Sequence, residues 1–156
     1  MEMVKCSEKL MGWVKERVAD ITAYRKLTPE FWNSVRDAIG LAGNEFNNHG
    51  GIMPDDRLTS SDCQSKARHC VRVTRGERTV ELFINETERS IHLFLLPEQK
   101  TTAIATLGLD QDRKRIKIMT SDADGSLKEI TSDQLCELAL SDLLFNPLPM
   151  MYPVVS

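Results

Sequence analysis

The chain has 156 residues, of which 20 are Lys or Arg and 23 are Asp or Glu, so its net charge is −3 at neutral pH. A hydrophobic fraction of 41% at this length fits one packed domain and excludes global disorder and collagen-like repetition. The isoelectric point of about 5.6 excludes a strongly basic nucleic-acid binder, so a role in binding nucleic acid would need a local basic patch.

Residues 4–26 predict an amphipathic helix, because their apolar side chains recur at intervals of three and four. The apolar stripe consists of Cys6, Leu10, Trp13, Val14, Val18, Ile21 and Tyr24. A new helix is expected to start at Thr28, which is a good N-cap, with Pro29 at the first helical position. This second helix runs to the Asn- and Gly-rich residues 47–51. We therefore expect two N-terminal helices joined at a tight corner.

Residues 47–66 are rich in Gly, Asn, Asp and Ser, include Pro54, and show no apolar period of either kind. This composition predicts a long loop. Loops of this length are uncommon inside compact domains and are usually either functional or disordered. We interpret residues 47–66 as a disordered segment or a plain connection between the helical part of the chain and the part that follows.

From residue 67 onward the apolar period changes to two, which predicts short strands with one buried face each. Turn signals such as Arg75-Gly76 and Asp124-Gly125 separate these strands. The links are too short for parallel crossovers, so we expect a five- or six-stranded antiparallel meander. The predicted strands cover about residues 67–75, 78–85, 90–96, 101–109 and 114–120, with a sixth at about 126–130.

A last helix begins at Thr131, where the sequence Thr-Ser-Asp-Gln has the form of a capping box, and it ends at Asn146-Pro147. The proline-rich tail, residues 147–156, is expected to be extended. It either folds back over its own core or occupies a groove on a partner. Together these elements predict a single α+β domain over residues 1–156.

The four cysteines are interpreted as free thiols in a reducing compartment, because they are spread along the chain rather than clustered. The chain lacks a secretory signal and a run of eighteen apolar residues, so a cytoplasmic protein without a membrane segment is expected. Cys63, His69 and Cys70 form the nearest ligand cluster. Adjacent strand residues point to opposite faces, however, so no metal ion or other cofactor is expected.

The most informative prediction concerns the second face of the sheet. If the regular apolar positions of the strands face the core, alternation places a group of apolar and aromatic residues on the other side. This group consists of Phe83, His92, Phe94 and Leu96, with Arg72, Arg115 and Lys117 as a charged rim. Either the helices cover both faces of the sheet, or this second face is an open binding surface.

The preferred hypothesis is a small protein-binding domain without catalytic activity, such as an adaptor, a chaperone-like carrier or an inhibitor. Aromatic side chains provide contact area and rim charges set the register of a complex. The partner is another protein or a second copy of the chain. A homodimer is expected, formed through the apolar sheet face or the N-terminal helices.

Two alternatives come from other functional classes. Phe83, His92 and Phe94 on an antiparallel sheet with basic neighbours are also suited to stack the bases of single-stranded nucleic acid, although Glu81 stands in the same patch and no RNA-recognition signature is present. An enzyme with an unrecognised site is the other alternative. No catalytic motif is found in the sequence, but triads assemble in space rather than in sequence, so no catalytic residue is assigned.

Overall fold

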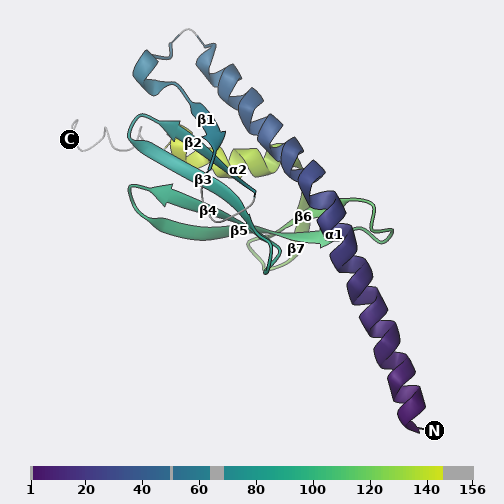
Figure 1. Ribbon diagram of the computed structural model, residues 1–156. Helices are drawn as coiled ribbons and strands as arrows, with labels where there is room; N and C mark the ends of the chain where they lie inside the picture. Colours follow the sequence, from purple (N-terminus) through teal and green to yellow (C-terminus); the bar gives the residue numbers. More distant parts are fainter. Residues whose placement is uncertain (1, 50, 64–68, 146–156) are drawn as a thin grey trace.

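The computed structural model describes residues 2–49, 51–63 and 69–145 and has α+β architecture (Figure 1). One long helix precedes seven strands and a C-terminal helix, with a single 3-10 turn before the first strand. The elements are α1 (Glu2–Asn47), η1 (Pro54–Asp56), β1 (Thr59–Asp62), β2 (Cys70–Arg75), β3 (Arg78–Asn85), β4 (Ser90–Leu96), β5 (Lys100–Leu109), β6 (Ile116–Ser121), β7 (Leu127–Ile130) and α2 (Ser132–Phe145).

The strands form one antiparallel sheet in the order β1-β2-β3-β4-β5-β6-β7, so the predicted meander is confirmed. Gly76 and Gly125 have positive φ angles of 60° and 87° in the turns after β2 and before β7, where a side chain would be strained. The prediction of five or six strands was wrong by one or two. The additional strand β1 lies inside residues 47–66, which were predicted to be a loop, and all four of its residues are exposed. It therefore lacks the alternation by which strands are recognised.

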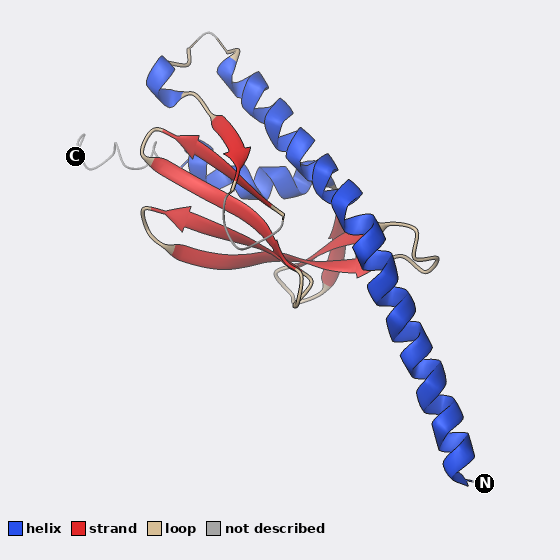
Figure 2. Cartoon of the chain, in the orientation of Figure 1, coloured by secondary structure: helices blue, strands red, loops and turns tan. Residues whose placement is uncertain are grey.

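Both helices pack on the same face of the sheet. Trp32, Val35 and Ile39 of α1 and Leu135 and Leu143 of α2 belong to one buried cluster with the inward-facing side chains of β2 to β7. The two helices also contact each other, and the Cys136 thiol of α2 lies 3.8 Å from the backbone carbonyl of Val35 in α1. Of the two alternatives, the one in which the helices cover both faces is thus wrong, and Figure 2 shows how the two helices and the sheet are arranged.

The prediction of two N-terminal helices was also wrong, because α1 is continuous through Pro29. A proline inside a helix removes one backbone hydrogen bond and usually costs about 3 kcal/mol. Pro29 is exposed, so water can bond to the carbonyl that the proline leaves without a partner, whereas its neighbour Thr28 is buried. Packing of the buried stripe on the sheet then favours a continuous helix over a corner.

Two arginines of the β2–β3 hairpin attach α2 to the sheet. Arg75 donates from Nη1 to the backbone carbonyls of Leu143 and Leu144, at 2.9 and 3.1 Å, near the C-terminal end of α2. Such carbonyls lack partners within the helix. Arg78 pairs with Glu98 at 2.7 Å and also with Asp142 of α2. These contacts help to fix the position of α2, which forms one wall of the groove described below.

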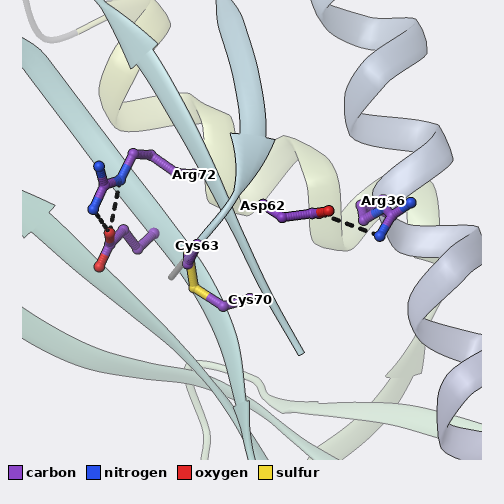
Figure 3. The surroundings of a disulfide bond; sticks show 6 residues. Arg36, Asp62, Cys63, Cys70 and Arg72 are labelled. Atoms are coloured by element: carbon purple, nitrogen blue, oxygen red, sulfur yellow. Dashed lines mark hydrogen bonds and ion pairs between the residues drawn. A yellow bond between two sulfur atoms is a disulfide. The ribbon is translucent and has the colours of Figure 1, made fainter. Parts of the chain in front are cut away.

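Cys63 and Cys70 form a disulfide, which corrects the prediction of free thiols for these two residues (Figure 3). Asp62 of β1 lies opposite Val71 of β2, so the next antiparallel pair brings Cys63 opposite Cys70, with a Cα–Cα distance of 5.3 Å. This spacing is typical of a disulfide. The bond was missed because the pairing becomes visible only after β1 is recognised. Cys136 is a free, buried thiol, while the Cys6 side chain and the tail 147–156 lie outside the described residues.

No helix in the described part of the chain is both long enough and apolar enough to cross a membrane.

Candidate functional site

The open face of the sheet brings four of the predicted residues together. Phe83 of β3 lies opposite His92 of β4, and Phe94 and Leu96 follow His92 at two-residue steps on the same face. The rings of Phe83 and His92 are stacked with their centres 5.4 Å apart. All four side chains are half-buried, and neither helix covers this face. Alternation therefore placed these residues correctly relative to one another.

The charged rim of this face is largely neutralised. Arg72 donates from Nε to Glu81 at 2.8 Å, and Arg115 donates to Glu129 at 2.7 Å. The Arg115 guanidinium also lowers the pKa of the Glu129 carboxyl, so this acid stays ionised at lower pH than usual. Lys117 lies beyond β5 from the aromatic residues, opposite Gly108. Because two rim cations are already paired with carboxylates, the face offers little free positive charge for phosphates.

A hydroxyl–imidazole pair lies beside the aromatic residues. The Ser90 hydroxyl is 2.7 Å from Nε2 of His92, and Glu88 approaches the same nitrogen at 3.5 Å. In a catalytic triad the acid contacts the other ring nitrogen and thereby orients the base. The arrangement therefore differs from a triad, and it is better explained as a hydrogen bond that satisfies the buried Ser90 hydroxyl.

One group of potential metal ligands occurs among the described residues. The side-chain ligand atoms of Cys63, Cys70 and Glu81 lie within 4.8 Å of one another. Metal ligation requires thiolates, whereas these two sulfur atoms are bonded to each other, and Glu81 is already paired with Arg72. In the disulfide form this group does not provide a ligand set for a metal ion.

A second candidate surface is the N-terminal part of α1, which projects beyond the sheet (Figure 1). We call residues 7–22 of this helix the arm. Its large apolar side chains are exposed, and the most prominent, Trp13, is 58% exposed. The exposed apolar residues of the arm are Leu10, Met11, Trp13, Val14, Val18 and Ile21. Apolar side chains gathered in one patch, unlike scattered ones, mark interaction sites on soluble proteins.

The exposed stripe of the arm continues the buried stripe of the same helix. Along α1, apolar residues recur with the 3-4 spacing of a heptad repeat. Positions a and d of this repeat are Met11, Val14, Val18 and Ile21 in the arm, followed by Arg25, Thr28, Trp32, Val35, Ile39, Ala42 and Phe46. From Thr28 to Ile39 these residues are buried against the sheet. The arm thus presents the same kind of surface past the edge of the sheet, and no described residue covers it.

The base of the arm is held by contacts to the sheet. Asp20 accepts a hydrogen bond from Nε of Arg113 at 2.7 Å, and this bond lowers the pKa of the Asp20 carboxyl. The Tyr24 hydroxyl donates to the backbone carbonyl of Leu107 at 3.3 Å. The guanidinium of Arg89 lies over the Tyr24 ring, 3.9 Å from its centre. These contacts fix the direction in which the arm leaves the sheet.

A third candidate surface is a groove between α1 and α2, with a volume of about 1130 Å³. Its floor is apolar and includes Leu140 and the free thiol of Cys136. Burial raises the pKa of this thiol to about 11, and the negative charges of Asp133 and Glu137 add to the effect, so the thiol stays protonated and is a poor nucleophile. The lining residues are Ser34, Asp37, Ala38, Leu41, Ala42, Glu45, Asp133, Cys136, Glu137, Leu140, Ser141 and Leu144.

The sequence predicted these three surfaces to different degrees. The open-face residues were found by alternation, and the arm was recognised as an apolar stripe, although its exposure was not. The groove was missed, because its two walls lie about a hundred residues apart in the sequence and meet only in the folded chain.

No protein-family model matches this chain, no curated protein matches its sequence, and no solved structure matches its fold. Its function therefore has to be inferred from the surfaces of the molecule.

Proposed function

We propose that this chain is a protein-binding domain without catalytic activity, which engages its partner through the apolar stripe of the arm. It would act as an adaptor, a chaperone-like carrier or an inhibitor. The observation that supports this proposal best is that the stripe packed on the sheet at Trp32 and Val35 continues, uncovered, through Met11, Val14 and Val18. A helix that presents an apolar stripe is suited to lie in a groove on another protein.

Replacing Val14 by aspartate should abolish partner binding, because it places a charge in the middle of the surface that becomes buried in the complex. The measurement is photo-crosslinking in cell extract, with benzoylphenylalanine at position 13, which keeps an aromatic side chain there. We expect a protein adduct that Val14→Asp eliminates.

Gly12→Asp is the matched control, because it adds the same charge on the opposite side of the helix, where a Cβ atom at position 12 would meet nothing within 4 Å. This variant should keep the adduct. Two results would contradict the proposal: the absence of any protein adduct from position 13, or equal loss of the adduct in both variants. Flotation of the protein with lipid vesicles, dependent on Val14, would instead assign the arm to a membrane surface.

The open sheet face is a second surface for the same function, supported by the absence of a described helix over Phe83, His92, Phe94 and Leu96. Phe94→Asp should dissociate the dimer or abolish binding of the partner, while the fold remains intact. Light scattering behind a sizing column reports the mass, and circular dichroism reports the fold. Thr102→Asp, at the exposed residue of β5 opposite the inward-facing Leu93 and therefore on the other face of the sheet, is the control. If Phe94→Asp unfolds the protein, Phe94 belongs to the core.

A further inference from the structure

The groove between α1 and α2 combines an apolar floor with an acidic rim. Leu41 is 70% exposed at its edge, although it is a large apolar side chain. The charged residues among those lining the groove are all acidic: Asp37 and Glu45 on the α1 wall, and Asp133 and Glu137 on the α2 wall. All four are exposed. An amphipathic helix whose apolar face is bordered by basic residues has the complementary chemistry.

The arm is such a helix. In the heptad that places Met11 and Val18 at position a, Lys15 occupies position e and Arg17 position g, so one basic residue borders each side of the apolar stripe. Glu16 and Asp20 fall at positions f and c, outside the a, d, e and g positions, and Asp20 pairs with Arg17 at 3.3 Å; Glu8, at position e, precedes the exposed stripe. Between Leu10 and Ile21 the arm therefore presents an apolar face with positive borders, and the groove presents an apolar floor with negative borders.

The border charges of the arm give little support to pairing of two arms with each other. The e and g positions of the arm are Glu8, Leu10, Lys15, Arg17 and Thr22, and Glu8 is the acidic residue among them. A parallel pair of arms would gain no ion pair at these positions, and an antiparallel pair would gain one only in the register that places Glu8 opposite Lys15 of the other arm. The groove offers four carboxylates to the basic residues of the arm, whereas a second arm offers one at its e and g positions.

The dimensions of the arm and the groove also agree. The exposed apolar residues of the arm run from Leu10 to Ile21, the α1 wall from Ser34 to Glu45 and the α2 wall from Asp133 to Leu144. Each of these segments is twelve residues long by its residue numbers, which corresponds to about 17 Å of helix. A helix with the length of the exposed stripe would therefore fit along the whole groove.

The arm cannot reach the groove of its own molecule, because both belong to the continuous helix α1 and lie at different heights along it. The tail 147–156 is a weaker candidate for the groove, because it contains no basic residue to oppose the four carboxylates. The occupant must therefore come from another molecule and carry basic residues beside an apolar stripe.

We infer that the arm of one copy of this chain docks in the α1/α2 groove of a second copy. This inference rests on the proposed function, since it names the partner of the same arm. If each of two copies inserts its arm into the other, a closed dimer results; if the exchange runs from head to tail, an open chain of molecules results.

A charge exchange between two variants tests this contact. The first variant, Lys15→Glu with Arg17→Glu, reverses the borders of the arm. The second, Asp37→Lys with Glu137→Lys, reverses one carboxylate on each wall of the groove. Each variant alone places like charges in the contact, so its self-association should weaken by about tenfold or more. In an equimolar mixture, the reversed arm of the first variant can dock in the reversed groove of the second, and the unchanged arm of the second can dock in the unchanged groove of the first. The mixture should therefore associate as the unmodified chain does.

Glu16→Lys with Glu30→Lys is the control, because it introduces the same charge change as the groove variant at exposed f positions of α1. It should associate normally. Light scattering at several protein concentrations gives the mass, which is 17.7 kDa for a single chain. A constant mass of twice the single chain would indicate the closed dimer. A mass that grows with protein concentration would indicate the open chain of molecules. Circular dichroism verifies that each variant is folded.

Three outcomes would overturn the inference. These are a monomeric unmodified chain at high concentration, normal association of the groove variant alone, and failure of the mixture to associate. A monomeric chain whose position 13 nevertheless crosslinks to another protein would reject self-docking and leave the proposed function intact. The absence of any adduct would reject both.

Discussion

Replacing Trp32 by alanine should lower the free energy of unfolding by about 3–5 kcal/mol, whereas Trp13→Ala should change it by no more than about 0.5 kcal/mol. Both tryptophans lie on α1, but Trp32 is 3% exposed within the core and Trp13 is 58% exposed on the arm. The loss at Trp32 combines the transfer of a large apolar side chain to water with the cavity that remains between α1 and the sheet.

Denaturant unfolding followed by circular dichroism measures both values, at a protein concentration low enough to suppress association. Fluorescence gives an independent reading, because Trp13→Ala leaves Trp32 as the single tryptophan of the chain. Its emission should then shift to the shorter wavelengths of a buried indole. A comparable loss of stability at Trp13 would mean that the arm packs against its own domain, and the arm would no longer be a free binding surface.

The contrast between these two tryptophans shows what a periodic pattern of apolar residues can predict and what it cannot. The stripe of α1 has the same spacing at Val14, next to Trp13, as at Trp32, so the sequence predicts that this face is buried without indicating by what. Where the sheet ends, the same stripe becomes exposed. The sequence of α1 does not reveal where the stripe changes from buried to exposed. This position depends on the width of the sheet and on the angle at which the helix crosses it.

The corner predicted at Thr28 and Pro29 failed for a related reason. The residues have the local signature of a helix start, and the signature is physically sound for an isolated segment. Thr28 is instead buried on the sheet, while Pro29 is exposed to solvent. The apolar residues on both sides of Pro29 continue one heptad, so tertiary packing outweighs the local preference. The phase of the repeat is kept across Pro29, although Arg25 and Thr28 interrupt its apolar character; a shift of phase at Pro29 would have supported the corner.

Alternation predicted strands β2 to β7 well, because their inward residues are apolar and their turns carry clear signals. It also placed Phe83, His92 and Phe94 on one face of the sheet. Whether a helix covers this face depends on how α1 and α2 are placed, and that placement is fixed by contacts such as those of Arg75 and Arg78 with α2. Contacts between distant parts of the chain leave no periodic trace in the sequence.

The edge strand β1 carries no alternation, and its place is fixed by contacts at both ends. The side-chain amide of Asn47 brackets the backbone of Leu58, donating to its carbonyl at 2.9 Å and accepting from its N–H at 2.8 Å. Asp62 pairs with Arg36 of α1 at 3.2 Å, as Figure 3 shows beside the disulfide. This short polar strand is therefore expected to depend strongly on its covalent link to β2.

Cys63→Ser should lower the free energy of unfolding of the oxidised protein by about 2 kcal/mol, because it removes a crosslink that closes a short loop in the unfolded chain. The two cysteines are seven residues apart in the sequence. Cys63 is the better of the two to replace, because it is only half-buried, whereas Cys70 is buried and continues to pack as a thiol in the variant.

The measurement is denaturant unfolding of both proteins with and without a thiol reductant. Without reductant the two midpoints should differ; with reductant the unmodified chain should lose stability and approach the variant, whose own midpoint should stay unchanged. Alkylation of the native protein followed by mass determination verifies that Cys63 and Cys70 are protected in the oxidised form. Equal stability of the two proteins without reductant would show that the bond adds nothing to β1 beyond the contacts of Asn47 and Arg36.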